Sequence, residues 1–153
     1  MSMVSEKSAL RKKMKEKRAA LMPDAYAARS HMICELLWQM SIVREARRIC
    51  CYAPLPQEAD LWELIERFFA MRDRQIAFPR VYVQDADSRM DFYEVGSRQE
   101  LSEGAFHVLE PVDDGRTPID WADALVLVPG VAFAADGSRC GYGKGYYDRY
   151  FSE

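Results

Sequence analysis

Hydrophobic and polar positions over the first forty residues predict two helices. Residues 5–20 consist almost wholly of good helix formers, and Ser5 is placed to cap the first turn. Because few of these residues are apolar, we expect this helix to lie on the surface with most of its basic side chains in water. A second helix is expected from Pro23 to about residue 41. Its apolar stripe, which we interpret as core, consists of Ile33, Leu36, Leu37 and Met40.

The pattern then changes to strands alternating with a helix. Residues 47–55 form a short apolar run that predicts a buried strand, and Pro54 and Pro56 end it. Residues 75–81 predict a second strand, and the strand, helix, strand order implies a parallel pair. The helix between them presents one apolar face, made of Leu61, Leu64, Ile65 and Phe68.

The last part of the chain adds two more strands. Residues 90–95 alternate as a short strand does, and residues 97–120 look like a mixed segment of turns. Residues 123–133 form the strongest predicted strand, because 124–128 are continuously apolar, as in buried parallel strands. We therefore expect a single α/β domain over residues 1–153. Its sheet should be open, mainly parallel and flanked by helices in a Rossmann-like, three-layer arrangement.

This arrangement predicts where a ligand binds. In open α/β sheets the ligand lies beyond the carboxyl ends of the strands, where loops lead into helix N-termini. Glu58, Arg80 and residues 139–148 belong to three such loops. We expect them to converge on one edge of the sheet.

Charge is distributed unevenly along the chain. The formal net charge is -3, so no global field favours nucleic acid, yet residues 1–18 hold seven Lys or Arg and only two Glu. No signal peptide is visible and no apolar run is long enough to cross a bilayer. We expect a cytoplasmic protein without membrane or nucleic-acid partners, acting as a monomer or weak homo-oligomer.

The cysteines and histidines do not suggest a metal site. Cys34, Cys50, Cys51 and Cys140 form no CxxC pair, so free thiols are the simplest interpretation. Cys50 and Cys51 lie in an apolar run and are expected in the core, and a catalytic role for Cys140 is not favoured. His31 and His107 are far apart in sequence and are expected on the surface.

Residues 137–151 read GSRCGYGKGYYDRYF and hold the strongest chemical signal. Glycines at alternate positions let a ligand approach the backbone N–H groups, while Arg139 and Lys144 add positive charge. A Walker A loop needs GxxxxGK followed by Ser or Thr, and a dinucleotide fingerprint needs GxGxxG; neither fits the GxGxG spacing found here. An ordinary turn before a helix is the simplest alternative. The basic and aromatic neighbours favour an anion or nucleotide site.

The segment LVPGVAFAADGSRCGYGKGYYDRY, residues 127–150, resembles the C-terminal signature of the 5-formyltetrahydrofolate cyclo-ligase family, also called methenyltetrahydrofolate synthetase. Four shorter motifs agree in order: KSALR at 7–11, QEAD at 57–60, FPR at 78–80 and LEP at 109–111. The resemblance covers nearly all of the chain. It implies an enzyme that cyclises 5-formyltetrahydrofolate to 5,10-methenyltetrahydrofolate while ATP becomes ADP and phosphate, with Mg²⁺ on the phosphates.

The resemblance also implies roles for individual residues. Arg139 and Lys144 are the expected catalytic cations, and Asp148 is the expected Mg²⁺ ligand, although Asp at a helix start is more often a cap. The expected ATP-binding residues are Lys7, Arg11, Arg139, Gly141, Gly143, Lys144, Gly145 and Tyr146. The expected folate-binding residues are Glu58, Tyr147 and Arg80. A solvated basic face is the alternative for Lys7 and Arg11, and a core position is the alternative for Tyr147.

The sequence departs from the family pattern in three places. Ala134 stands where the family commonly has Asp, and Leu61 stands where Thr is usual. Family members usually continue past GYYDRY with further strands and an acidic residue, so we expect these strands to be missing here. Two rival functions remain open at this stage: a non-catalytic folate or nucleotide binder, and an RNA-associated protein that uses the basic helix. The basic helix lacks the interleaved aromatic residues that single-stranded RNA recognition needs.

Overall fold

The computed structural model describes residues 2–83, 88–120 and 122–153. Its helices are α1 (Met3–Ala19), α2 (Pro23–Gln39), α3 (Ser41–Glu45), α4 (Trp62–Ala70) and α5 (Tyr146–Tyr150), with 3-10 turns η1 (Arg98–Glu100) and η2 (Ala105–His107). Its strands are β1 (Arg48–Cys50), β2 (Gln75–Tyr82), β3 (Arg89–Glu94), β4 (Leu101–Glu103), β5 (Leu109–Pro111), β6 (Leu125–Val126), β7 (Ala132–Phe133) and β8 (Arg139–Cys140).

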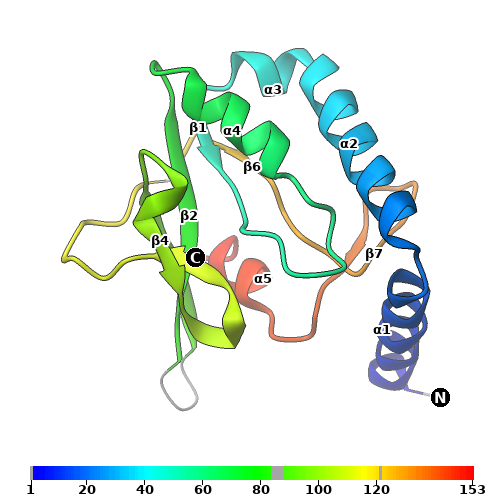
Figure 1. Ribbon diagram of the computed structural model, residues 1–153. Helices are drawn as coiled ribbons and strands as arrows, with labels where there is room; N and C mark the ends of the chain where they lie inside the picture. Colours follow the sequence, from blue (N-terminus) through cyan, green and yellow to red (C-terminus); the bar gives the residue numbers. More distant parts are fainter. Residues whose placement is uncertain (1, 84–87, 121) are drawn as a thin grey trace.

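The central sheet is mixed but mostly parallel, as expected for an α/β protein (Figure 1). Its strand order is β3-β2-β1-β6. Strand β1 pairs in parallel with β2 and β6, with Ile49 opposite Ile76 and Leu125, whereas β3 runs antiparallel to β2. The predicted strand, helix, strand unit over β1, α4 and β2 is therefore confirmed.

Alternation along the strands gives the sheet two apolar faces. Ile49 and Phe78 face the helices α2, α3 and α4, where they pack with Leu64 and Phe68. The predicted apolar face of α4 is confirmed. The opposite face carries Cys50, Ala77 and Phe92, and the tyrosines of α5 pack against it. Both faces of the short central strands are thus covered, which accounts for their near-continuous apolar sequence.

Helix α1 lies on the surface, and polar contacts help to attach it to the rest of the protein. None of its residues is buried, as expected from its few apolar positions. The prediction for its cap was wrong: the helix begins two residues before Ser5, and the Ser2 hydroxyl accepts the Ser5 N–H at 3.3 Å. The helix lies against the segment around β7 (Figure 1), where Arg18 Nη2 donates to the carbonyls of Gly130 and Val131 at 2.7 and 2.9 Å. Arg18 is therefore not one of the solvated basic residues.

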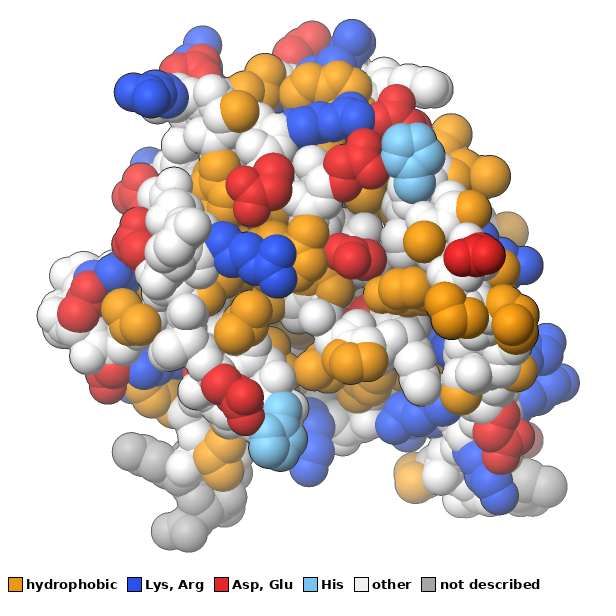
Figure 2. Space-filling model, in the orientation of Figure 1, with side chains coloured by type: hydrophobic (Ala, Val, Ile, Leu, Met, Phe, Trp, Pro, Cys, Tyr) orange, Lys and Arg blue, Asp and Glu red, His pale blue; other side chains and the backbone are white. Residues whose placement is uncertain are grey.

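The predicted core stripe of α2 was only partly right: Leu37 packs against the core, whereas the other three members are largely exposed. The side chains of Ile33, Leu36 and Met40 are 38%, 56% and 50% exposed, and hydrophobic side chains are visible on the surface over this helix (Figure 2). The buried residues of α2 are Ser30 and Cys34. Small side chains let α2 approach the loop before α4, where Ser30 Oγ accepts the backbone N–H of Asp60 at 3.0 Å.

Other boundaries also differ from those expected. Helix α2 ends at Gln39, and α3 begins separately at Ser41. Residues 97–120 contain the hairpin of β4 and β5 in addition to turns. The strongest predicted strand, 123–133, is divided into two short strands, β6 and β7, and residues 124–129 are only half-buried. The reason is that β6 is an edge strand, which pairs with β1 and has no further neighbour among the described residues.

The packing of α4 gives a matched test of stability. Leu64 is fully buried, whereas Leu36 on α2 is 56% exposed. We expect Leu64→Ala to lower the free energy of unfolding by about 2–5 kcal/mol because it leaves a cavity, and Leu36→Ala to change it by less than about 0.5 kcal/mol. Urea denaturation of both variants measures the difference. Equal losses would contradict this account of the core.

Candidate functional site

A cavity of about 460 Å³ lies between α1, the segment after β6, the glycine-rich segment and η2. Four cationic side chains line it: Arg11, Lys15, Arg139 and Lys144. Asp148 is the one carboxylate among the described residues of the lining. The convergence of residues 139–148 with the loop after β1 is confirmed, since Leu55 lines the same cavity. A concave site rich in positive charge is suited to a polyanionic ligand.

The backbone of the glycine-rich segment is open to a ligand. Gly143 and Gly145 have φ of +98° and +71°, in the left-handed region that favours glycine, and Gly145 is the N-cap of α5. Within the described part of the chain, the N–H groups of Gly143, Lys144 and Gly145 donate to no protein acceptor. Successive free N–H groups beside a cavity form an anion-binding concavity.

Arg139 organises this segment from within. Its Nη1 donates to the Pro129 carbonyl at 3.1 Å, and its Nη2 pairs with Asp148 Oδ1 at 2.7 Å. A Cβ at Gly141 would lie 2.7 Å from Arg139 Nη1, so glycine at 141 makes room for the guanidinium. Asp148 is not the helix cap, and its side chain is 79% exposed. Lys144 Nζ lies 5.2 Å from the centre of the Phe106 ring.

Helix α1 contributes two cations, only one of which was expected. Arg11 Nε donates to the Gly141 carbonyl at 2.8 Å, whereas Lys7 is exposed and does not line the cavity. Sequence reasoning missed Lys15, whose Nζ lies 5.6 Å from the centre of the Tyr142 ring. Lys15 and Arg18 follow Arg11 by four and seven residues, so the helical period was the signal that could have found them.

The other expected site residues divide into two groups. Tyr146 and Tyr147 line the cavity, and the Tyr147 ring also packs edge-on against Phe92, 6.4 Å between ring centres. Tyr147 therefore both lines the cavity and packs in the core. Burial raises the pKa of its hydroxyl. Arg80 does not line the cavity, because its guanidinium pairs with Asp113 at 3.4 Å.

Glu58 lies beside a second cavity of about 340 Å³. Its side chain is only 6% exposed, and Oε2 accepts the backbone N–H of Leu55 at 2.7 Å. Tyr52 lines the same cavity, and burial together with the nearby Glu58 raises the pKa of Tyr142. Pro129 lines both cavities, so they are adjacent.

The structure shows what surrounds Leu61 and Ala134, the two substitutions that depart from the family pattern. Leu61 precedes α4 and is buried in the core, and the Trp62 N–H is accepted by Asp60 Oδ1 at 3.0 Å in place of a side-chain cap from residue 61. Ala134 lies at the turn between β7 and β8, where its N–H bonds the Ser138 carbonyl. Neither residue lines the first cavity.

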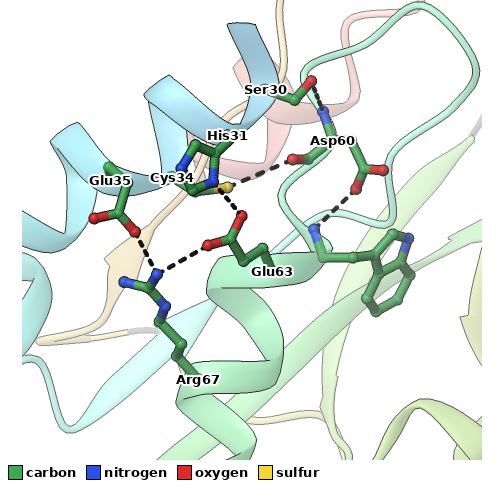
Figure 3. A network of polar contacts seen from close by, with 8 residues as sticks. Ser30, His31, Cys34, Glu35, Asp60, Glu63 and Arg67 are labelled. Atoms are coloured by element: carbon green, nitrogen blue, oxygen red, sulfur yellow. Dashed lines mark hydrogen bonds and ion pairs between the residues drawn. The ribbon is translucent and has the colours of Figure 1, made fainter. Parts of the chain in front are cut away.

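A separate polar network joins α2 to α4 (Figure 3). His31 Nδ1 lies 2.7 Å from Glu63 Oε2, and Arg67 pairs with both Glu63 and Glu35. The potential ligand atoms of His31, Glu35 and Glu63 lie within 4.8 Å of one another. Arg67 already neutralises the carboxylates, so we interpret the group as a salt-bridge network and not as a metal centre. His31 and His107 are both on the surface, as expected.

Known proteins share this sequence and architecture. The sequence pattern described as the 5-formyltetrahydrofolate cyclo-ligase family matches residues 3–153. The chain belongs to that family. It is 30% identical to the 5-formyltetrahydrofolate cyclo-ligase of Saccharomyces cerevisiae, over 97% of this chain and 76% of the yeast protein. It is 26% identical to the Mus musculus 5-formyltetrahydrofolate cyclo-ligase, over 95% and 73% of the two chains.

Solved structures in the family have the same fold. The NMR structure of Aquifex aeolicus 5,10-methenyltetrahydrofolate synthetase superposes with a TM-score of 0.80 at 31% identity, covering 95% of this chain and 72% of that one. The chain spans about three quarters of the length of these relatives. None of the helices in the described ranges has the length and hydropathy that a membrane-spanning segment requires.

The network of Figure 3 predicts a pH dependence. The hydrogen bond and negative charge of Glu63 raise the pKa of His31 above its ordinary 6.5. Because the pKa is raised in the folded state, the stabilisation is fully present below about pH 6.5 and is lost as the pH rises through the folded pKa. NMR titration should give a raised pKa for His31 that falls toward 6.5 in Glu63→Gln. An unchanged pKa in this variant would show that the pair does not form.

Proposed function

We propose that the protein catalyses the ATP-dependent cyclisation of 5-formyltetrahydrofolate to 5,10-methenyltetrahydrofolate, with release of ADP and phosphate. Family membership makes it a cyclo-ligase. The single observation that carries the proposal is that the glycine-rich family signature lines a cavity together with four cationic side chains. These are the features that a triphosphate requires of its site.

The reaction has two steps. The formyl oxygen attacks the γ-phosphorus of ATP and the bond to ADP breaks, which converts a poor leaving group into a phosphate ester on the formyl carbon. Nitrogen 10 of the same folate then attacks that carbon, loses its proton, and phosphate departs with the former formyl oxygen. The protein has little covalent chemistry to perform, so positioning and charge neutralisation account for most of the catalysis.

The contacts of the four cationic side chains suggest different roles for the arginines and the lysines. Arg11 and Arg139 are already bonded to backbone carbonyls, so they hold the walls and contribute charge from a fixed position. Among the described residues, the ammonium groups of Lys15 and Lys144 lie near aromatic rings and form no hydrogen bond or ion pair, so they can turn toward phosphate oxygens. We place Lys144 beside the transferring phosphoryl group, where removal of negative charge accelerates the reaction most. The free N–H groups of Gly143 and Gly145 bind the remaining oxygens.

Magnesium fits the donor set of this cavity. Mg²⁺ commonly takes one or two carboxylates and completes its shell with phosphate oxygens and water. Asp148 supplies such a carboxylate, because Arg139 binds Oδ1 and leaves Oδ2 available on a largely exposed side chain. Held by Asp148, such an ion would supply positive charge that offsets the negative charge of the phosphates.

The aromatic walls and Glu58 provide the folate side of the site. Tyr147 and Phe106 present ring surface to the first cavity, which suits a flat pterin. Glu58 is a buried carboxylate that lines the second cavity and can accept hydrogen bonds from pterin N–H groups. Arg80 is bound to Asp113 and takes part only if ligand binding releases it.

We also propose that the layering of the domain, the cellular compartment and the oligomeric state are those expected from the sequence. Helices on both faces of the sheet support a single, Rossmann-like layered domain. The free cysteines, three of them buried, are consistent with a reducing compartment such as the cytoplasm. We further propose that the protein acts as a monomer or weak homo-oligomer.

Turnover of Lys144→Ala tests the proposed function. The methenyl product absorbs in the near ultraviolet, so its formation from 5-formyltetrahydrofolate, ATP and Mg²⁺ can be followed directly. We expect the wild-type protein to form it, and Lys144→Ala to be slower by at least about 100-fold because charge beside the transferring phosphoryl group is lost.

Lys12→Ala is the matched control, because Lys12 is an exposed lysine of α1 outside the cavity lining. It should retain the wild-type rate, and both variants should unfold at the same temperature as the wild type. A wild-type rate in Lys144→Ala would remove this residue from the mechanism. Tight folate binding without product in the wild type would instead indicate a binding protein.

A further inference from the structure

A buried carboxylate with no role in the proposed mechanism lies behind one wall of the first cavity. Among the described residues, Glu58 and Glu110 are the two carboxylates that are buried, and Glu110, on β5, is 5% exposed. Its Oε1 accepts the backbone N–H of Val81 at 3.3 Å. Burial of a carboxylate costs free energy, and this hydrogen bond offsets part of the cost.

The Glu110 carboxylate contacts two segments that line the first cavity. One is the end of β2, where Val81 lines the cavity. The other is the turn between β4 and β5, which contributes Phe106 and Val108 to the lining. Gly104 begins this turn, and a Cβ on it would lie 2.2 Å from Glu110 Oε2, so the turn packs directly on the carboxylate. Glu110 therefore joins both parts of this wall.

The turn has an unfavourable backbone conformation. Phe106 and His107 each have a φ of +59°, in the left-handed region that residues other than glycine rarely adopt. Such strain persists only where the surrounding structure holds it. His107 Nδ1 lies 2.6 Å from Glu103 Oε1, but both side chains are largely exposed, and an exposed pair contributes little. Glu110 supplies the turn with a buried contact.

This strained turn presents an aromatic ring to the site. The Phe106 side chain is 50% exposed. The centre of its ring lies 5.2 Å from Lys144 Nζ and 6.4 Å from the centre of the Tyr146 ring. An open aromatic ring at a cavity wall suits a ligand with a flat apolar surface. In the proposed function, that ligand is the pterin of the folate.

We propose that Glu110 is a positioning residue for folate binding: by contacting Val81 and Gly104, it keeps the strained turn in the conformation that presents Phe106 to the pterin. The assignment rests on the proposed function, which places reduced folate against Phe106. In the described part of the chain, Glu110 forms no hydrogen bond or ion pair with the glycine-rich segment, where the phosphates bind. Loss of its side chain should therefore weaken folate binding and leave nucleotide binding nearly unchanged.

Isothermal titration calorimetry measures the two affinities separately, with 5-formyltetrahydrofolate as one ligand and a non-hydrolysable ATP analogue with Mg²⁺ as the other. In Glu110→Ala we expect the dissociation constant of folate to rise at least about tenfold, because a buried hydrogen bond and the support of the turn are lost. The dissociation constant of the analogue should stay within about twofold of the wild-type value.

Two conservative variants separate the position of the side chain from its charge. Glu110→Gln keeps the length and an oxygen that can accept the Val81 N–H. Burial raises the pKa of Glu110, so a neutral amide should be tolerated there, with folate binding within about threefold of wild type. Glu110→Asp keeps the charge but shortens the side chain, and it should weaken folate binding at least about fivefold. It also tests the contact if Glu110→Ala does not fold.

Ser102→Ala is the matched control. Ser102 lies opposite Glu110 in the β4–β5 hairpin, but it is exposed and lines neither cavity. This variant should bind both ligands as the wild type does. Wild-type folate affinity in folded Glu110→Ala, equal losses of folate and nucleotide affinity, or a Glu110→Gln as weak as Glu110→Ala would overturn the positioning role. A wild-type protein that binds neither ligand would overturn the proposed function itself.

A double-mutant cycle tests whether Glu110 acts through the aromatic ring. Phe106→Ala removes a largely exposed side chain and should by itself weaken folate binding. Adding Glu110→Ala to Phe106→Ala should then change the folate dissociation constant by less than about twofold, because the ring that Glu110 positions is already absent. Independent losses from the two substitutions would show that Glu110 acts by another route, and the proposal would be wrong.

Discussion

The site depends on arginine side chains that bind backbone carbonyls. Arg11 holds the Gly141 carbonyl, Arg18 holds those of Gly130 and Val131, and Arg139 holds that of Pro129. Hydrogen bonds from charged donors each contribute roughly 1.5–3 kcal/mol. Because α1 buries no side chain fully, the bonds of Arg11 and Arg18 contribute to its attachment to the body of the protein. Two of the seven basic residues in the N-terminal segment, Arg11 and Arg18, thus hold it in place, while its lysines are exposed as expected for a solvated face.

The protein combines a well-packed sheet and helix α4 with less regular segments around the first cavity. The sheet and α4 form an apolar core with fully buried residues such as Ile49 and Phe68. The walls of the cavity, by contrast, come from segments with two-residue strands, turns and a short helix. Loops of this kind can present free N–H groups to a ligand, which regular strands cannot do. The arginine side chains, together with the packing of the α5 tyrosines against the sheet, help these segments to keep a defined shape.

The sequence predicted the features that depend on local periodicity. The face of α4 and the position of the glycine-rich segment beyond the strands were correct, and the family signature identified the segment before its contacts were known. Features that depend on tertiary packing were not predictable. The buried face of α2 uses Ser30 and Cys34, which no hydrophobic pattern marks, and β6 is half-buried because it lies at the sheet edge. The placement of Lys15 in the cavity and of Lys7 outside it likewise depends on how α1 docks.

The central claim is that the backbone of the glycine-rich segment binds the phosphates of ATP. Titration of ¹⁵N-glycine-labelled protein with a non-hydrolysable ATP analogue and Mg²⁺ tests it most directly. The account predicts that the amide signals of Gly143 and Gly145 shift and saturate, while those of Gly115 and Gly137, which also have positive φ but lie outside the cavity lining, remain in place. Saturable binding that leaves the Gly143 and Gly145 signals unmoved would contradict it.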